Sequence, residues 1–378
     1  MGRGHAPGGS TGAEPAGTER FPGVPGATLS GRHGAGRWFP ATPDDVLDLV
    51  DAPVDGAAVG AALELGLFWL LEPRPLEVDA VASALGMPAR RCERWLDVLG
   101  QAGLVERGPS GCSPTAAARA TILGSYSRET WALLAEEARE RLATLADLPA
   151  RLRAPAPGPA AAPSIQPYVA RMAADPDRAR RFTRMLAEVH RPLAAALAEQ
   201  IDLAGVGRLM DLGGGSGVVS MALAERWPDL AVTVVDVPTV CAAGRELVAE
   251  RGLGGRIGFW PADFVHDRLP AGFDAVLECD VDVYGEELFG RIRDSLDAGG
   301  RYLIVDALDP DVGSAERLRW AFQRSLAGAD DVPATPGTIA DQLRAARFAV
   351  VASGPLPPLP GPSREIGDGG LWLIEARA

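Results

Sequence analysis

From Gly207 onward, short runs of β-branched and apolar residues alternate with amphipathic segments of helix length, and this alternation constrains the fold more than any other feature. Strands that alternate with helices form a parallel sheet through crossover connections. The pattern predicts an α/β domain over 201–378, built on a doubly wound sheet. The seven expected strands are Arg208–Asp211, Ala231–Asp236, Arg256–Trp260, Phe273–Glu278, Arg301–Asp306, Phe348–Ala352 and Leu371–Glu375. We expect one of the intervening helices to begin at Thr338, with Asp341 completing a capping box.

Residues 37–125 carry a helical pattern instead. The expected elements are three helices, over Ala58–Leu71, Val78–Leu85 and Arg90–Leu99, and two short strands, over Gly103–Arg107 and Cys112–Thr115. Three helices followed by a wing indicate a winged-helix domain. Between Asp44 and Gly124, twelve acidic residues outnumber six arginines, which gives a net charge of −6 that would repel DNA phosphates. We therefore expect this domain to form a dimer interface. The alternative is that the protein is not an enzyme but a regulator that binds DNA through the winged helix.

Two further parts complete the predicted organisation. Residues 1–36 are rich in glycine and proline and contain little to bury, which is typical of a disordered tail. Residues 126–200 form a helical connector with long helices near Arg128–Leu148 and Asp177–Gln200. A Pro/Ala linker over 154–163 interrupts this connector, because proline cannot continue a helix.

Composition excludes several classes of function. The chain has no lysine, so it has neither a Schiff-base lysine nor a P-loop lysine. The net charge of −13 argues against bulk binding of nucleic acid. No apolar run is long enough for a membrane helix, and the N-terminus lacks the apolar block of a signal peptide. Four widely spaced cysteines form neither a disulfide framework nor a zinc motif, so we expect a cytoplasmic protein without membrane partners.

The first predicted strand ends in the run Asp-Leu-Gly-Gly-Gly-Ser-Gly over 211–217, and a helix follows directly. A glycine turn at the carboxyl end of the first strand is where an open α/β sheet binds a nucleotide. The dinucleotide pattern G-x-G-x-x-G is not met, because its third glycine position holds Val218. A carboxylate at Asp211 disfavours a pyrophosphate and suits a cationic cofactor. A nicotinamide or flavin dinucleotide remains the alternative ligand.

Two further acidic positions follow at the ends of the next strands. Asp236 comes 23 residues after Gly213, where a carboxylate can accept hydrogen bonds from both hydroxyls of a ribose. Asp263 and Phe264 come after the third strand, where an acid can meet the adenine amino group while a ring covers the adenine face. The three motifs in this order predict a site for an adenosine-containing cofactor.

These motifs, together with 298–305 and the winged-helix pattern, resemble the S-adenosylmethionine (SAM)-dependent small-molecule O-methyltransferases, and particularly the bacterial branch that modifies secondary metabolites. The resemblance extends from about Asp44 to Arg377. It includes the spacing of Tyr168, Asp175, Pro176, Phe182 and Met185, which is similar to the connector helix that covers the active site in this family.

The resemblance implies a Rossmann-like class I methyltransferase domain, a winged-helix dimerisation domain and a homodimer. It further implies SAM as cofactor and a small aromatic, phenolic or enolisable natural product as substrate. The implied cofactor-binding residues are Asp211, Gly213, Gly215, Asp236, Val237, Asp263, Phe264 and Cys279. The implied substrate-lining residues are Phe182, Met185, Trp320 and Phe322.

One position departs from the family pattern. The histidine that usually deprotonates the acceptor aligns with Val283, and valine cannot act as a base. The candidate catalytic residues are therefore Asp282, His266 and His190. The departure also leaves open an alternative function, in which the enzyme keeps SAM but catalyses decarboxylation, hydroxylation or cyclisation. Acidic residues near His266 have no metal-ligand spacing, so we predict no metal site.

Overall fold

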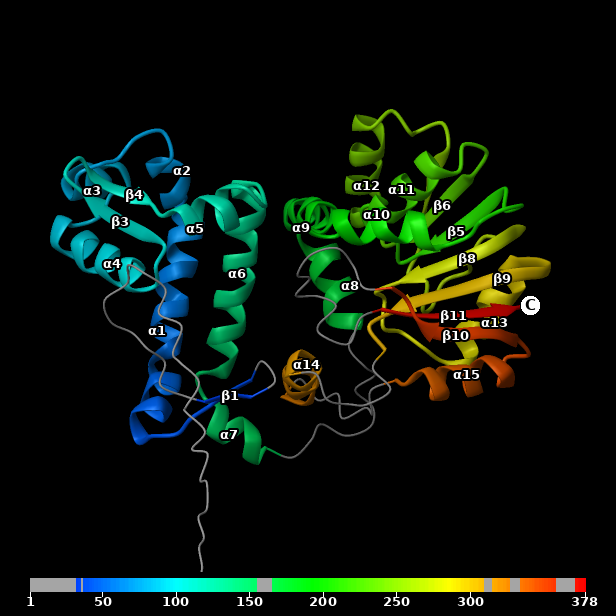
Figure 1. Ribbon diagram of the computed structural model, residues 1–378. Coiled ribbons are helices and arrows are strands. Elements are labelled where there is room, and N and C mark those ends of the chain that lie inside the picture. The colour runs from blue at the N-terminus through cyan, green and yellow to red at the C-terminus, as the bar shows by residue number, and fades with distance from the viewer. Residues whose placement is uncertain (1–31, 35–36, 155–164, 309–314, 327–333, 358–370) are drawn as a thin grey trace, which may run out of the picture.

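The computed structural model of the chain describes residues 32–34, 37–154, 165–308, 315–326, 334–357 and 371–378. An N-terminal helical lobe and a C-terminal sheet domain lie side by side, with α8 and α9 between them (Figure 1). Of the predicted tail and linker, residues 1–31, 35–36 and 155–164 lie outside the described residues. Arg32–Gly34 (β1) pairs with Arg37–Phe39 (β2), so the prediction of a structureless tail was wrong for these three residues. Backbone pairing of this kind needs no apolar side chains.

The N-terminal lobe contains the predicted wing and helices, except that Gly66 divides the helix predicted over Ala58–Leu71 into two. Its elements are α1 (Pro43–Leu65), α2 (Leu67–Leu71), α3 (Val78–Ala84), α4 (Ala89–Gln101), β3 (Val105–Gly108), β4 (Gly111–Pro114), α5 (Ala116–Ala118) and a π-helical turn at Arg119–Leu123. Thr42 and Asp45 form a capping box that begins α1 well before the predicted start. Gly66 ends α1 in the left-handed conformation at φ 74°, which turns α2 back so that Leu67 and Phe68 are fully buried.

The connector continues with α6 (Arg128–Leu145), α7 (Leu148–Arg153), α8 (Ile165–Ala174), α9 (Pro176–Val189) and α10 (Arg191–Gln200). The single helix predicted over 177–200 was wrong, because α9 and α10 are separate and meet at His190. Pro192 explains the break, since its ring would clash with the carbonyl of Glu188 and it offers no N–H to that carbonyl. His190 therefore lies at the junction, where one helix ends and the next begins.

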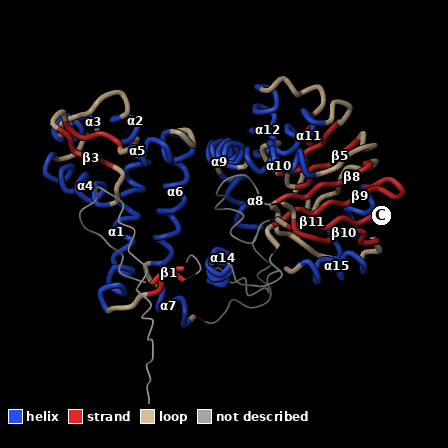
Figure 2. Tube along the Cα trace, in the orientation of Figure 1, coloured by secondary structure: helices blue, strands red, loops and turns tan. Residues whose placement is uncertain are grey.

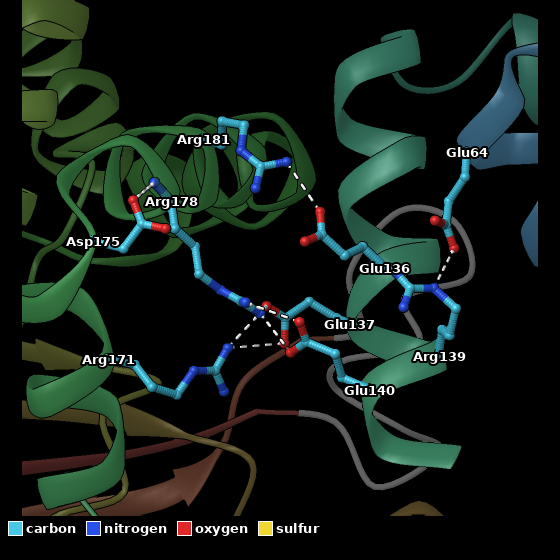
Figure 3. A network of polar contacts seen from close by, with 9 residues as sticks. All are labelled: Glu64, Glu136, Glu137, Arg139, Glu140, Arg171, Asp175, Arg178 and Arg181. Carbon is cyan, nitrogen blue, oxygen red and sulfur yellow. Dashed lines mark hydrogen bonds and ion pairs between the residues drawn. The ribbon is translucent and has the colours of Figure 1, made fainter. Parts of the chain in front are cut away.

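A network of ion pairs joins α6, which packs against α1 of the N-terminal lobe, to α8 and α9 (Figure 3). Arg178 lies between Glu137 and Glu140, at 2.5 and 2.7 Å, and only 16% of its side chain is exposed. Arg171 reaches Glu137 at 2.9 Å. On the opposite side, α9 pairs with α12 (Pro238–Glu250) of the sheet domain. Charged contacts on both sides of α9 therefore connect the two lobes.

The sheet has seven strands in the order β10-β11-β9-β8-β5-β6-β7. The strands are β5 (Arg208–Leu212), β6 (Ala231–Asp236), β7 (Ile257–Pro261), β8 (Phe273–Cys279), β9 (Leu296–Asp306), β10 (Ala349–Pro355) and β11 (Trp372–Arg377). All seven predicted strands are present, with bounds that differ by up to five residues. The predicted parallel pairing is present among β5, β6, β7, β8 and β9, but β11 runs antiparallel to both β9 and β10.

Helices cover both faces of the sheet (Figure 2). They are α11 (Val218–Arg226), α12 (Pro238–Glu250), α13 (Glu286–Ser295) and α15 (Pro336–Ala345), while α14 (Ala315–Leu326) lies apart from the sheet (Figure 1). One apolar core lies between the sheet and α10, α11 and α12, and the other between the sheet, α13 and α15. None of the described helices is both long enough and apolar enough to cross a bilayer.

The prediction that a helix begins at Thr338 was wrong. Thr335 is the N-cap of α15, and Thr338 is its capping-box partner at the third helical position. Pro336 explains the earlier start, because proline is favoured in the first turn of a helix, where its missing N–H costs nothing. The carboxyl ends of β5, β6, β8 and β9 lie at the edge that faces α8 and the N-terminal lobe (Figure 1).

Candidate functional site

The turn after β5 adopts a conformation that only glycine accepts readily. Gly213, Gly215 and Gly217 have φ values of 70°, 55° and 73°. A Cβ atom on Gly213 would lie 2.7 Å from a methyl carbon of Val281. The Gly213 amide donates to the carbonyl of Val235 at 2.8 Å, which holds the turn against β6. The turn thus brings bare backbone to the carboxyl edge of the sheet.

Asp211 lies beneath this turn. Its carboxylate is 1% exposed and accepts a hydrogen bond from the hydroxyl of Ser220 at 2.5 Å. A Cβ atom on Gly214 would clash with the carboxyl group of Asp211. Burial raises the pKa of Asp211 to about 6, although the Ser220 hydrogen bond acts in the opposite direction. Asp211 thus supports the turn from below and adds negative charge there.

Asp236 ties the turn to the end of β6. Its Oδ2 atom accepts the amide of Gly215 at 3.0 Å, and its Oδ1 atom accepts the amide of Val237 at 2.7 Å. Burial raises the pKa of this carboxyl to about 7, and both amide hydrogen bonds lower it. A carboxylate can accept about four hydrogen bonds, so each oxygen retains capacity for a ligand hydroxyl. The predicted juxtaposition of the glycine turn and Asp236 is therefore present in the structure.

Helices α8 and α9 cover the carboxyl end of β6. The rings of Tyr168 and Phe182 meet edge to face with their centroids 6.0 Å apart, in a small apolar cluster that includes Val237. Burial and then the charge of Asp236 raise the pKa of the Tyr168 phenol. Tyr168 was not predicted as a site residue, although it belongs to the connector motif. Met185 is 5% exposed, and its contact with a substrate stays a prediction, as does that of Phe182.

The third predicted motif, Asp263 and Phe264, also lies beside the glycine turn. Phe264 is 7% exposed, and a ring carbon lies 3.6 Å from the position of a Cβ atom on Gly213. Asp263 accepts the amide of Val265 at 3.1 Å and pairs with Nδ1 of His266 at 3.0 Å. The His266 side chain is 61% exposed. His266 therefore lies with the adenine-side motif, on the solvent side of Asp263.

The loop after β8 is tightly held. Asp280 and Asp282 have φ values of 56° and 53°, in the left-handed region that non-glycine residues seldom adopt. The Asp280 amide donates to the carbonyl of Val305 at 3.0 Å. The Asp306 carboxylate accepts the Asp282 amide at 3.2 Å and the Tyr284 hydroxyl at 2.5 Å. Such backbone strain persists only where surrounding contacts determine it, and it is concentrated at functional sites.

His190 faces this loop from the α9–α10 break. Its Nε2 atom lies 3.6 Å from Oδ2 of Asp280, and its side chain is 17% exposed. Of the three predicted catalytic residues, the structure thus brings His190 and Asp282 to the same loop and leaves His266 at the adenine-side motif. The sequence does not reveal that Asp280 pairs with His190, because the pairing depends on how distant elements pack.

Glu278, at the end of β8, is another buried acid beside this loop. Glu278 is 1% exposed and accepts a hydrogen bond from the Tyr302 hydroxyl. Burial raises the pKa of Glu278 to about 8, and the negative charges of Asp306 and Asp282 act in the same direction. Next to it, burial raises the pKa of the Cys279 thiol, and the charges of Asp280 and Asp211 add to the effect. A cofactor contact of Cys279 stays a prediction.

The remaining predicted residues lie on α14. Phe322 is 40% exposed, and the side chain of Trp320 lies outside the described part of the structure. An α7 side chain reaches α14, since Arg151 donates to the carbonyl of Leu326 at 3.2 Å. Within the described residues, no group of three or more His, Cys, Asp or Glu side chains could hold a metal ion.

The arrangement at the sheet edge fits a cationic nucleoside better than a phosphate ester. Three buried acids, Asp211, Asp236 and Glu278, come close to the glycine turn or the loop beside it. A positive ligand would offset the desolvation that raises the pKa of each. The absence of side chains at Gly213 and Gly215 allows a ligand to approach the backbone closely. These features match the cofactor that the sequence predicts.

Comparison with known proteins gives consistent results. The family model of the O-methyltransferase domain matches residues 164–325. The chain is 29% identical over 317 residues to the 3-hydroxy-5-methyl-1-naphthoate 3-O-methyltransferase of Streptomyces sahachiroi, covering 76% of this chain and 87% of the relative. It is 30% identical over 278 residues to the N,N-dimethyltransferase OxyT of Streptomyces rimosus, covering 70% and 78%. The solved structure of PigF with SAH superposes with a TM-score of 0.74 at 22% identity, covering 89% of this chain and 100% of that chain.

Proposed function

Because the chain belongs to the family of SAM-dependent O-methyltransferases, we propose that it methylates an aromatic or enolisable small molecule of secondary metabolism. The observation that carries the proposal is the Asp236 carboxylate, held by the amides of Gly215 and Val237 beside a glycine turn. The names of the relatives support the substrate class, since one acts on a hydroxynaphthoate. Both curated relatives are named as methyltransferases, so they give no support to the alternative of a SAM-retaining enzyme without methyl transfer.

The buried acids and the glycine turn fit SAM. In the proposal, Asp236 and Val237 hold the ribose, Asp263 and Phe264 the adenine, and Gly213, Gly215, Asp211 and Cys279 surround the methionine part. When bound, SAM supplies an electrophilic methyl group whose bond to sulfur breaks, with both electrons left on sulfur, as the bond to the acceptor atom forms. The protein aligns the acceptor with that methyl group and excludes water, and alignment of this kind is worth about 7–11 kcal/mol of the barrier.

A mass-spectrometric assay tests the proposed activity. The purified chain is incubated with SAM carrying a ¹³C-labelled methyl group and with 3-hydroxy-5-methyl-1-naphthoate or another hydroxylated naphthoate as probe. We expect a labelled methyl ether and one equivalent of demethylated cofactor for each product. Consumption of the probe with SAM left intact would establish the non-methylating alternative. Tight SAM binding without transfer to any phenolic or enolisable probe would contradict the proposal.

We further propose that the protein is a homodimer assembled through its N-terminal lobe. Val46, Val50 and Val54 follow one another at intervals of four residues along α1, and they are 48%, 66% and 64% exposed. Leu47 and Leu49 widen this apolar face and are also more than half exposed. An apolar face of this size on one helix is typical of a protein interface. The four cysteines are all free, which agrees with the proposed cytoplasmic location.

Light scattering during size-exclusion chromatography tests the dimer. We expect the mass of two chains for the wild type and of one chain for a Val50→Asp, Val54→Asp double variant. Asp48→Asn, on the polar side of the same helix, is the matched control and retains the dimer. A monomeric wild type at micromolar concentration would contradict this proposal without affecting the methyl-transfer assay.

A further inference from the structure

We propose that His190 is the base that takes the proton from the acceptor hydroxyl, and that Asp280 positions and stabilises its charged form. This inference rests on the proposed methyl transfer. His190, at the α9–α10 junction, would take the place of the family's proton-accepting histidine, whose aligned position holds Val283 in this chain. The contact that carries this inference is the 3.6 Å approach of His190 Nε2 to Asp280 Oδ2 at the carboxyl edge of the sheet.

The break between α9 and α10 gives His190 its position. Pro192 prevents α9 from continuing, and the backbone of His190 sits at φ −85° and ψ 2°, between the two helices. The His190 amide still donates to Leu186, while its carbonyl accepts from Ala194. The side chain is thus fixed at a corner of the backbone rather than on the outer face of a continuous helix.

The N-terminal lobe fixes the same corner. Glu188, two residues before His190, accepts hydrogen bonds from the amide and hydroxyl of Ser127 at 2.9 and 2.7 Å. It also accepts the hydroxyl of Thr130 at 2.5 Å. Both donor residues lie at the start of α6. Glu188 is therefore a positioning residue that links the placement of His190 to the packing of the two lobes.

Asp280 is held with similar firmness on the sheet domain. Its amide bonds to β9, and its left-handed backbone conformation sets the direction of its side chain. Asp280 directly precedes Val281, whose methyl carbon would lie 2.7 Å from a Cβ atom on Gly213 of the glycine turn. The His190–Asp280 pair therefore lies beside the part of the site proposed to hold the methionine end of SAM, where the methyl group would be transferred.

The neighbouring groups are less suited to take a proton. His266 is paired with Asp263 at the adenine-side motif and is mostly exposed. Asp306 accepts hydrogen bonds from the amides of Asp282 and Ala307 and from the Tyr284 hydroxyl, so both of its oxygens are already engaged. Burial and the charge of Asp306 raise the pKa of Tyr284, so its phenol stays protonated.

The proton balance of the step is simple. A lone pair of the acceptor oxygen would form the bond to the methyl carbon while the methyl–sulfur bond breaks and leaves its electron pair on sulfur. The O–H proton would move to an imidazole nitrogen of His190, and the O–H electrons would remain on oxygen. Asp280 stabilises the resulting imidazolium, which later releases the proton to water. The charged residues next to His190 along the chain are Glu188 and Arg191. The Glu188 carboxylate favours the imidazolium, while Arg191 opposes it.

The first test compares His190→Gln with the wild type in the labelled-methyl assay. Removal of a general base reduces the rate by about 10²–10⁴-fold. We expect kcat to fall at least 100-fold at pH 7, the acid limb of the kcat profile to disappear, and the dissociation constant of SAM to change less than threefold. Glu199→Gln, at an exposed position of α10, is the control and keeps wild-type kinetics. Added imidazole should partly restore the activity of His190→Ala, an effect that a purely structural role would not produce.

The second test uses Asp280→Asn and does not depend on turnover. In the cofactor-free protein, the ring-proton NMR signal that His190→Gln removes should titrate at lower pH in Asp280→Asn than in the wild type, because the stabilising carboxylate is gone. An unchanged titration, or a His190→Gln variant that retains full kcat, would overturn the inference while leaving methyl transfer intact. A variant that loses SAM affinity but not kcat would make His190 a binding residue, which also overturns it. Absence of methyl transfer by the wild type, in contrast, would refute the proposed function itself.

Discussion

Replacement of Asp236 by asparagine is the most informative change at the proposed cofactor site. The side chain keeps its shape, but the negative charge is lost and one carboxylate oxygen becomes an NH₂ group. The two oxygens now accept the amides of Gly215 and Val237, so one of these donors must face another donor in the variant. The proposed ribose contacts lose their charged acceptor at the same time.

The expected loss of affinity follows from these contacts. A hydrogen bond to a charged group contributes about 1.5–3 kcal/mol. Loss of two such bonds to the ribose corresponds to at least about 3 kcal/mol, and each 1.4 kcal/mol is about a factor of ten in affinity. We therefore expect S-adenosylhomocysteine to bind Asp236→Asn at least 100-fold more weakly than the wild type.

The same substitution should raise the stability of the fold relative to the wild type as pH rises, although it weakens cofactor binding. The pKa of Asp236 rises from 3.8 to about 7 on folding, so the folded state retains this proton longer than the unfolded state. Such a group destabilises the fold increasingly as pH rises through this interval. Between pH 5 and pH 8 this amounts to about 3 kcal/mol in the wild type, at 1.36 kcal/mol per pKa unit. The asparagine side chain of the variant carries no proton to lose, so the variant should escape this loss.

Calorimetric titration with S-adenosylhomocysteine and urea unfolding at pH 5 and pH 8 measure the two effects. Asp229→Asn, at an exposed position before β6, is the control for both. We expect the variant to gain stability relative to the wild type between pH 5 and pH 8, while its affinity falls. Unchanged affinity in Asp236→Asn would refute the assignment of this carboxylate to the ribose. A stability difference independent of pH would refute the placement of a desolvated acid there.

Three other substitutions have expected outcomes. Gly213→Ala places a Cβ atom in a left-handed conformation, which costs about 1–2 kcal/mol, and should lower both the unfolding free energy and cofactor affinity in the same assays. Tyr302→Phe removes the hydrogen bond to Glu278 and should cost about 1–3 kcal/mol in urea unfolding; the loss should be larger at pH 9 than at pH 6, because the ionised carboxylate needs the donor more, and an equal loss would contradict the buried acid. Arg178→Gln leaves Glu137 with Arg171 alone, and hydrogen exchange along α9 should become faster, whereas unchanged exchange would show that the ion-pair network does not couple the lobes.

The sequence predicted the sheet domain well, because its strands are apolar runs separated by helices and turns. Every predicted strand is present, and the glycine turn and Asp236 meet as expected. The errors occurred where local rules compete. Thr335 and Thr338 both resemble N-caps, and only the neighbouring Pro336 decides between them. The antiparallel direction of β11 depends on which edge of the sheet remains open, which periodicity does not reveal.

The part of the site contributed by several elements was harder to predict. His190 was predicted as a candidate base. The continuous helix predicted around it was wrong, because Pro192 separates α9 from α10. The Asp280 partner comes from a strand end far along the chain, and no spacing rule connects the two. Tyr168 and the Tyr302–Glu278 pair were missed for the same reason, since their contacts depend on how separate elements pack.

The central claim is that the carboxyl edge of the sheet, around the turn at Gly213 and Gly215, holds adenosyl sulfonium. A crystal structure of the protein with S-adenosylhomocysteine tests it most directly. The account predicts electron density for the ribose within hydrogen-bond distance of both carboxylate oxygens of Asp236, with the sulfur on the side of His190 and Asp280. Density for the nucleoside elsewhere, or a ribose that does not contact Asp236, would contradict it.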